Sequence, residues 1–302
     1  MEATRYRRLN YEKERKKMNT KTISNPIILI STIYKSLTKA EQKVADFVIA
    51  DTQETVYSSV TDLAEKSGVG ETTVIRFCRK LGYRGYQEFK LAIAQNLADP
   101  DEQVHGKIEE NDNIETILKK ITSQNVQTLE STLQLLESQK LDKAVEAIMS
   151  ANKLYFFGVG SSGLTAFDGK YRFMRLGYHV EQSSDSHIMA MNAALVSKND
   201  VVFGISTSGS TKDVVDAIAI AKENNAFIIC ITNHAKSPIT QYADVILLAA
   251  SKETPLQGGA FASKIAQLHL LDVLTTIIVL KQKEKTFQSI EKTAKAVLDK
   301  MY

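Results

Sequence analysis

The C-terminal half of the chain alternates short apolar runs with segments of helical periodicity. This pattern starts beyond Asn152 and continues to Leu280. Strands that are buried on both faces form continuous apolar runs, and parallel strands need helices between them as crossovers. The alternation therefore predicts a parallel α/β sheet covered by helices in three layers. The expected strands are 154–157, 201–205, 226–231 and 245–248, and the expected helices are 164–176, 212–224 and 261–280.

Two loops rich in glycine and hydroxyl side chains stand where an expected strand ends and a helix begins. In open parallel sheets, ligands bind beyond the carboxyl ends of the strands. Amides, hydroxyls and the positive end of a helix dipole together favour an anion. We expect Ser206, Ser208 and Thr211 to hold a phosphate and Ser161 and Ser162 to contact sugar oxygens. The whole expected site comprises Gly160, Ser161, Ser162, His187, Ser206, Thr207, Ser208, Gly209, Ser210, Thr211 and Glu253.

The first loop also permits a dinucleotide interpretation. Residues 158–163 match G-x-G-x-x-G, and Glu181 stands at the end of a possible next strand, as in NAD-binding proteins. A redox-sensing repressor that binds NAD is therefore a rival. A dinucleotide site leaves the second hydroxyl loop without an obvious purpose, whereas two converging loops suit a small phosphorylated sugar. Both loops could also be ordinary turns, in which serine and glycine are common.

Short amphipathic helices are expected before residue 98. Thr38 and Glu41 fit a capping box at the start of a helix that ends at Asp51, and a polar break follows to Thr55. Further helices are expected at about 61–67, 71–80 and 86–97. Apolar residues fall on inward positions, and Gly68 lies in the turn between two of these helices, although Ser67 is polar at a position that is usually apolar. The spacing predicts a helix-turn-helix motif at about 60–80.

The second helix of this motif presents a cationic outer face. Thr72, Arg76 and Arg79 recur at i, i+4 and i+7. Arginine can pair bidentately with guanine, and hydroxyl or basic side chains can contact phosphates. We therefore expect double-stranded DNA as a partner, although a solvated face on an unrelated helical hairpin would show the same charges. The expected DNA-binding residues are Thr72, Thr73, Arg76, Arg79, Lys80 and Arg84.

Composition is that of a globular protein with an uneven distribution of charge. The 302 residues are 43% hydrophobic and 24% charged, with a net charge of +3. Residues 1–97 carry 17 Lys/Arg against 11 Asp/Glu, whereas residues 99–112 carry six acids and one lysine. Cys78 and Cys230 lack the neighbours of a metal or redox motif, so we expect buried free thiols in a reducing cytoplasm and neither a metal nor a cofactor. No membrane span is expected, because the most apolar segment, 270–280, is too short.

These observations predict an all-α DNA-binding domain followed by an α/β domain. The expected division is a disordered basic extension at 1–19, the helix-turn-helix domain at 20–97, an acidic linker at 98–113, connecting helices at 114–150, the α/β domain at 151–283 and a C-terminal helix at 284–302.

Residues 72–83, TTVIRFCRKLGY, followed by Gly85, Tyr86 and Phe89, closely resemble the N-terminal domain of RpiR-type transcription regulators. The later loops resemble the sugar isomerase (SIS) domain of the same family, which has a flavodoxin-like fold. The resemblance implies an effector-controlled repressor or activator, with repression the expected sign, that forms a homodimer or homotetramer through its SIS domains and reads a palindromic operator. Ser162, Ser206, Ser208 and Thr211 match the positions at which SIS proteins bind sugar phosphate. Segment 255–260, PLQGGA, resembles regulators of amino-sugar catabolism, which favours N-acetylmuramic acid 6-phosphate or N-acetylglucosamine 6-phosphate as effector.

SIS folds also serve isomerases and lyases, so catalysis needs separate consideration. An aldose-ketose isomerase requires a base beside the carbonyl and a group that helps to open the ring. The available candidates are His187, Glu253, His269 and Asp272, with Gln257 and Lys264 weaker. None of them is in an arrangement that demands catalysis. An attached DNA-reading domain gives ligand binding a sufficient purpose, so we expect a sensor and not an enzyme.

Overall fold

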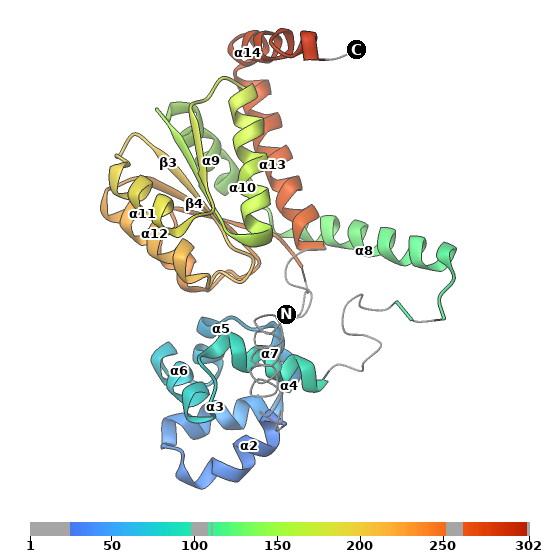
Figure 1. Cartoon of the computed structure of the whole chain (residues 1–302), viewed down its shortest axis with the longest axis vertical. Helices are drawn as coiled ribbons and strands as arrows, with labels where there is room; N and C mark the ends of the chain where they lie inside the picture. The colour runs from blue at the N-terminus through green and yellow to red at the C-terminus, as the bar shows by residue number, and fades with distance from the viewer. Residues whose placement is uncertain (1–24, 98–107, 110, 252–261, 301–302) are drawn as a thin grey trace, which may run out of the picture.

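The computed structural model of the chain describes residues 25–97, 108–109, 111–251 and 262–300. The expected basic extension 1–19, most of the acidic linker, Glu253 and segment 255–260 lie outside the described residues. Helices before residue 98 form one domain, and a parallel sheet with flanking helices forms the other (Figure 1).

The N-terminal domain contains more helices than the sequence pattern predicts. Its elements are α2 (Pro26–Ile33), η1 (Tyr34–Ser36), α3 (Lys39–Ala50), α4 (Thr52–Tyr57), α5 (Val60–Lys66), α6 (Glu71–Lys80) and α7 (Tyr86–Leu97). The expected polar break at 51–55 is wrong, because Asp51 ends α3 and accepts a hydrogen bond from the amide of Glu54 at 2.8 Å as the N-cap of α4. Helix α2 was not predicted. It begins with Asn25 as N-cap and Pro26 in its first turn, both of which favour a helix start.

Helices α5 and α6 form the predicted helix-turn-helix. Gly68 has φ +63° in the turn, and the amide of Val69 donates to the carbonyl of Ala64 at 2.9 Å, which closes the end of α5. Phe77 on α6 packs edge-on against Phe89 on α7 at 5.6 Å between ring centroids. Ser67 is buried with its hydroxyl unpaired, as expected for a polar residue at an apolar position.

The C-terminal domain is built on a five-stranded parallel sheet in the order β2-β1-β3-β4-β5. The strands are β1 (Leu154–Phe157), β2 (Val180–Ser183), β3 (Val201–Ile205), β4 (Phe227–Thr232) and β5 (Val245–Leu248). From β1 the chain runs first to β2 on one side of it and then crosses to β3 on the other side. The strand order therefore reverses between β1 and β3. Ligands bind at such a reversal of strand order. The predicted α/β class is confirmed.

Helices cover both faces of this sheet (Figure 1). One face packs against α9 (Ser138–Ser150), α10 (Gly160–Arg175) and α13 (Ala262–Lys281), and the other packs against α11 (Ser186–Leu195), α12 (Lys212–Glu223) and η2 (Pro238–Tyr242). In the first layer Phe156 stacks on Phe203 with ring centroids 4.3 Å apart. Gly169 of α10 lies over Phe156, where a Cβ atom would come within 2.5 Å of the ring.

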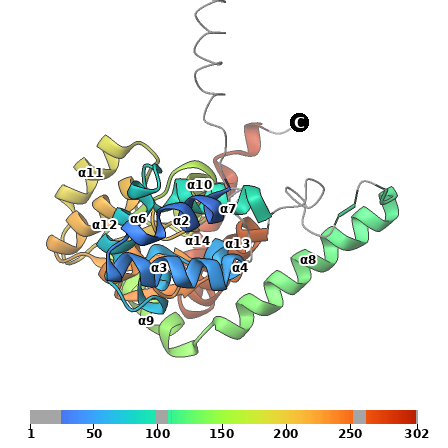
Figure 2. The ribbon, with the colours of Figure 1, turned by 90° about the horizontal axis from the view of Figure 1, so that it is seen from below.

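Two long helices and a C-terminal pair complete the chain. Helix α8 (Ile114–Leu135) packs against α13 and projects away from the other labelled helices (Figure 2). Helices α14 (Lys283–Lys295) and η3 (Leu298–Lys300) follow α13. Helix α13 is longer than the expected apolar segment. Of the described helices it alone is long and apolar enough to cross a membrane. Core helices of globular domains pass the same test, and Leu270, Leu274 and Ile278 of α13 are buried in the sheet core.

Each domain core contains one cysteine thiol. Cys78 on α6 and Cys230 on β4 are both fully buried and free. Burial raises the pKa of both thiols far above the usual range. Both groups therefore stay protonated and unreactive in the folded protein.

Candidate functional site

The loop between β3 and α12 gathers hydroxyl groups at the carboxyl edge of the sheet. Ser206 is 1% exposed, and its Oγ lies 3.0 Å from Oγ1 of Thr211. The hydroxyl of Ser208 accepts from the amide of Ser210 at 3.3 Å, and Gly209 turns the chain with φ +62°. Thr211 is the N-cap of α12, yet its side chain makes no capping hydrogen bond. The first amides of α12 thus lack a side-chain partner beside a cluster of hydroxyls, a combination that suits an anion.

The loop between β1 and α10 stands at the same edge, because β1 and β3 are neighbours in the sheet. Gly160 has φ +55° and begins α10, whose N-cap residue Val159 offers no side-chain hydrogen bond. Ser162 is buried on the first turn, and Ser161 is half-buried beside it. The structure therefore brings two uncapped helix N-termini, and the two predicted loops, to one edge of the sheet.

The dinucleotide interpretation loses part of its support. Glu181 is the second residue of β2 and pairs in register with Tyr155, so the expectation that it ends the strand is wrong. Its carboxylate lies 3.4 Å from Nζ of Lys153, which precedes β1. An acidic residue that binds a ribose must instead reach the carboxyl end of its strand, where β2 has Ser183.

Helix α13 connects the two loops through a buried polar network. Lys264 donates to the carbonyl of Ser161 and, at 2.7 Å, to the hydroxyl of Thr165. Gln267, which is 1% exposed, accepts from Thr165 at 2.7 Å and donates to the hydroxyl of Thr207 at 3.0 Å. Burial lowers the pKa of Lys264. Lys264 is one of the weaker candidates expected from the sequence, and Gln267 is not among the expected residues. The available signal was two polar residues three positions apart in an apolar helix.

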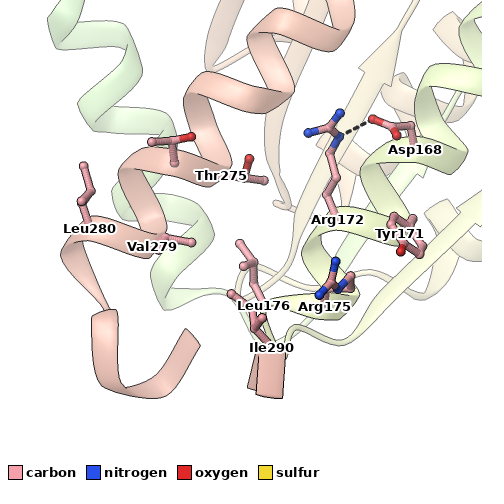
Figure 3. Close-up of a pocket in the computed structure, with 10 residues that line it drawn as sticks. Asp168, Tyr171, Arg172, Arg175, Leu176, Thr275, Val279, Leu280 and Ile290 are labelled. Carbon is pink, nitrogen blue, oxygen red and sulfur yellow. Dashed lines mark hydrogen bonds and ion pairs between the residues drawn. The ribbon is translucent and has the colours of Figure 1, made fainter. Parts of the chain in front are cut away.

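The other candidates for catalysis lie in different surroundings. His187 is an exposed residue of the first turn of α11, and the helix is capped by Asp185, whose carboxylate accepts from the amide of His187 at 3.0 Å. Asp272 pairs with Arg172, which also binds Asp168, so it joins α13 to α10. Figure 3 shows the pair of Arg172 with Asp168 at a pocket between α10, α13 and α14, which Arg175 and Thr275 also line. Asp272 therefore forms a contact between helices.

The predicted DNA-binding residues divide into exposed and engaged groups. Thr72, Arg76 and Arg79 are exposed on one side of α6, and Arg84 is exposed in the following turn. Thr73 is 9% exposed, and its hydroxyl accepts from Arg76 at 3.4 Å. Lys80 Nζ donates to the carbonyl of Ser36 at 2.7 Å and lies 3.1 Å from the carboxylate of Glu41. Arg84 also pairs with Glu88 at 3.3 Å. The exposed face of α6 therefore presents fewer residues than the predicted set, because Thr73 and Lys80 contact other residues of their own domain.

Two family models match the chain. A helix-turn-helix domain of the rpiR family matches residues 25–100, and the SIS domain matches residues 147–277. The first covers α2 to α7, and the second covers the sheet and both loops.

Relatives match over nearly their whole length. An HTH-type transcriptional regulator of Haemophilus influenzae is 36% identical over 91% of this chain and 97% of its own. The HTH-type transcriptional regulator HexR of Escherichia coli is 32% identical over 92% and 96%. Among solved structures, the Vibrio vulnificus NanR protein complexed with ManNAc-6P has a TM-score of 0.83 at 31% identity and covers 92% of this chain and 99% of that one. With both domains in the same order and relatives of this similarity, the chain belongs to the RpiR family of HTH-type transcriptional regulators.

Proposed function

We propose that this regulator is a cytoplasmic repressor whose SIS domain binds a phosphosugar and whose helix-turn-helix domain binds an operator. The observation that carries the effector proposal is the pair of uncapped helix N-termini, α10 and α12, at adjacent strand ends. One anion can accept hydrogen bonds from both helix starts and from Ser206, Ser208 and Thr211. Such a site needs no cationic side chain to bind phosphate.

The sugar itself would lie toward the first loop and α13. Ser161 and Ser162 lie in the first turn of α10. Lys264 and Gln267 connect this turn, through Thr165, to Thr207. Hydroxyl and amide groups in these positions suit the polar edge of a sugar. His187, at the start of α11, belongs to the same edge of the sheet, because β2 precedes it.

The effector class is an amino-sugar 6-phosphate. NanR, which is similar over almost the whole chain, was solved with ManNAc-6P. We therefore place ManNAc-6P first in a panel with N-acetylglucosamine 6-phosphate and N-acetylmuramic acid 6-phosphate. Glucose 6-phosphate and unphosphorylated N-acetylmannosamine complete the panel and test the need for the acetamido group and for the phosphate.

Thermal shift of the full chain measures this binding. We expect phosphorylated sugars to raise the melting temperature, and the Ser206→Ala/Ser208→Ala double variant to lose the shift while it still unfolds cooperatively. Ser150→Ala, at the exposed end of α9, is the matched control, because its hydroxyl donates to carbonyls of its own helix. An equal shift in the double variant and the native chain would contradict the phosphate site.

Operator binding depends on the exposed face of α6 in this proposal. Arg76→Ala should weaken specific binding to the promoter region by about 1–3 kcal/mol if the guanidinium reads a base. Lys43→Ala, an exposed residue of α3, is the control and should change little. Retardation of DNA that Arg76→Ala leaves unchanged would remove α6 from the recognition surface.

Two alternative functions, a phosphosugar isomerase and an NAD-sensing repressor, can be tested with the same protein. Phosphosugar isomerases share the SIS fold at 21–22% identity, a likeness that concerns the fold alone. Formation of an isomerised product from any sugar phosphate of the panel would make the chain an enzyme. A thermal shift with NADH and none with sugar phosphates would favour the redox repressor.

A further inference from the structure

The segment 233–242 lies between the SIS domain's hydroxyl loop and the helix-turn-helix domain, and we call it the docking loop. It follows β4 and includes η2. On one side it contacts α5, the helix of the N-terminal domain that faces the α/β domain (Figure 1). On the other side it contacts residues 206–211, so it touches both functional parts of the chain.

The contacts with α5 combine a hydrogen bond, an ion pair and a contact between a histidine and a carboxylate, and they run from the N-cap of the helix to its last turn. The hydroxyl of Ser59, the N-cap of α5, donates to the carbonyl of Lys236 at 2.7 Å. Nζ of Lys236 lies 2.6 Å from Glu65, and Nδ1 of His234 lies 3.4 Å from Asp62. Although burial alone would raise the pKa of Asp62, hydrogen bonds from His234 and Ser59 lower it to about 2. Asp62 is therefore an anion when it meets the docking loop.

The docking loop also contacts the N-terminal end of α6, the second helix of the helix-turn-helix motif. Gln241 of the docking loop donates to Glu71, the first residue of α6, at 3.4 Å. Glu71 also accepts from Thr61 of α5, so the two helices of the motif are joined where the docking loop meets them.

These are the ends that a helix-turn-helix presents to DNA. The N-terminal residues of the recognition helix reach base edges in the groove, and the first helix crosses the phosphate backbone. In the docked arrangement the starts of α5 and α6 instead contact residues 233–242. The docking loop therefore occupies the side of the motif on which α5 and α6 begin, while Thr72, Arg76 and Arg79 stay exposed.

The other side of the docking loop is hydrogen-bonded to the backbone of residues 206–211, the loop between β3 and α12. The amide of Asn233 donates to the carbonyl of Thr207 at 3.1 Å, and the amide of Ile239 donates to the carbonyl of Gly209 at 3.0 Å. Ser237 packs under Gly209 so closely that a Cβ atom there would stand 2.0 Å from its hydroxyl. A ligand that fixes residues 206–211 thus fixes the two carbonyls that hold the docking loop.

We infer that residues 233–242 form an autoinhibitory contact: they dock the starts of α5 and α6 onto the SIS domain, exclude DNA in that arrangement, and are held there when the phosphosugar loop is occupied. This regulation rests on the proposed function for its effector. The docking itself does not, because it can be measured without ligand. A ligand can shift the equilibrium only through its different affinities for the docked and released states, and contacts to residues 206–211 supply that difference.

Charge reversal at Lys236 tests the docking. Lys236→Glu faces Glu65 and Asp62 with a like charge and should release α5. The variant loses the attraction between Lys236 and Glu65 and gains a repulsion, which destabilises the docked state. If the docked state predominates in the native chain, we expect operator binding to become about fivefold tighter. The added negative charge by itself would weaken DNA binding, so the expected change has the opposite sign to a simple electrostatic effect. Lys198→Glu, an exposed lysine elsewhere on the SIS domain, is the matched control.

The double variant Lys236→Glu/Glu65→Lys restores an opposite pair with its charges exchanged. Fluorescence anisotropy with operator DNA and no ligand should show its affinity return toward that of the native chain, although the variant adds positive charge to the DNA-binding domain. Unchanged or weaker binding by Lys236→Glu, with an unchanged melting temperature, overturns the inference. So does a double variant that binds as tightly as Lys236→Glu.

Hydrogen exchange with ManNAc-6P then separates the two proposals. In the native chain the ligand should protect peptides covering 206–211, 233–242 and the start of α5. In Lys236→Glu it should protect only the first two. Protection that reaches α5 equally in both chains overturns the inference. Absence of protection at 206–211 contradicts the proposed effector site and the ligand-held part of the inference, while the ligand-free measurements still decide the docking.

Discussion

Lys90 is a buried lysine in the core of the DNA-binding domain, and its replacement by methionine should stabilise that domain. It lies on α7, is 6% exposed, and donates from Nζ to the carbonyl of Ser58 at 2.9 Å. Burial lowers its pKa from 10.5 to about 8, with Asp62 opposing part of the shift. The carbonyl of Ser58 also accepts from the hydroxyl of Tyr86 at 2.9 Å, so it keeps a partner when the amine is removed.

The magnitude follows from the difference between folded and unfolded pKa. A shift of about 2.5 units corresponds to about 3 kcal/mol of destabilisation at pH 7, where the amine is charged in both states. Between pH 8 and 10.5 the unfolded chain binds more protons than the folded one, so this destabilisation shrinks as the pH rises, to about 1 kcal/mol at pH 9.5. Loss of the hydrogen bond to Ser58 costs about 1 kcal/mol at either pH. Lys90→Met should therefore gain about 2 kcal/mol at pH 7 and almost nothing at pH 9.5.

Urea unfolding of the full chain, followed by far-UV circular dichroism at both pH values, measures the difference between the variant and the native chain. Taking the difference cancels the titration of other groups that both chains share. Lys43→Met, an exposed lysine of the same domain, should change stability little at either pH. Lower stability of Lys90→Met than of the native chain at pH 7, or a stability difference between them that does not depend on pH, would refute the prediction that the buried charge of Lys90 destabilises the folded domain.

Three further substitutions test the SIS domain. Gly209→Ala requires a side chain at φ +62° and a Cβ atom 2.0 Å from the hydroxyl of Ser237, so it should abolish the thermal shift with sugar phosphate; a retained shift would mean that the loop rearranges freely. Gly169→Ala places a Cβ atom 2.5 Å from the Phe156 ring and should lower the unfolding free energy by about 1–3 kcal/mol in urea, whereas an unchanged value would contradict tight packing of α10 on β1. Gln267→Leu removes the partner of two hydroxyls and should cost about 1–3 kcal/mol by the same assay; a neutral or stabilising result would show that the polar network contributes no stability.

The elements that the sequence predicts well are those whose signals are local. Expected helices at 61–67 and 71–80 correspond to α5 at 60–66 and α6 at 71–80, because an inward apolar pattern and a turn glycine lie close together in the sequence. Helix α4 was missed because its sequence, TQETVY, is polar and its stability comes from the Asp51 cap and from packing of Val56 against other helices. Strand β2 was anticipated only as a possibility. It is an edge strand whose sequence, VEQS, is only partly buried.

The same distinction applies to the candidate site. Both loops could be placed at one sheet edge from sequence, because parallel strands end on the same side. The network of Lys264, Gln267 and Thr165 could not, since it depends on how α13 packs beside α10, and these helices are about a hundred residues apart. Contacts of His234 and Lys236 with α5 are equally non-local. Periodicity reports which face of a helix is buried, but not which distant helix covers it.

The two buried cysteines make the chain a reporter of its own unfolding. Cys78 lies in the core of the DNA-binding domain and Cys230 in the sheet of the SIS domain. A thiol reagent reaches each sulfur only when the surrounding core opens, so the labelling rate of each residue measures the opening of one domain. Mass spectrometry of the labelled peptides therefore gives two local stabilities from one native sequence, with no engineered probe. Effector binding that stabilises one domain alone can then be told from binding that stabilises both.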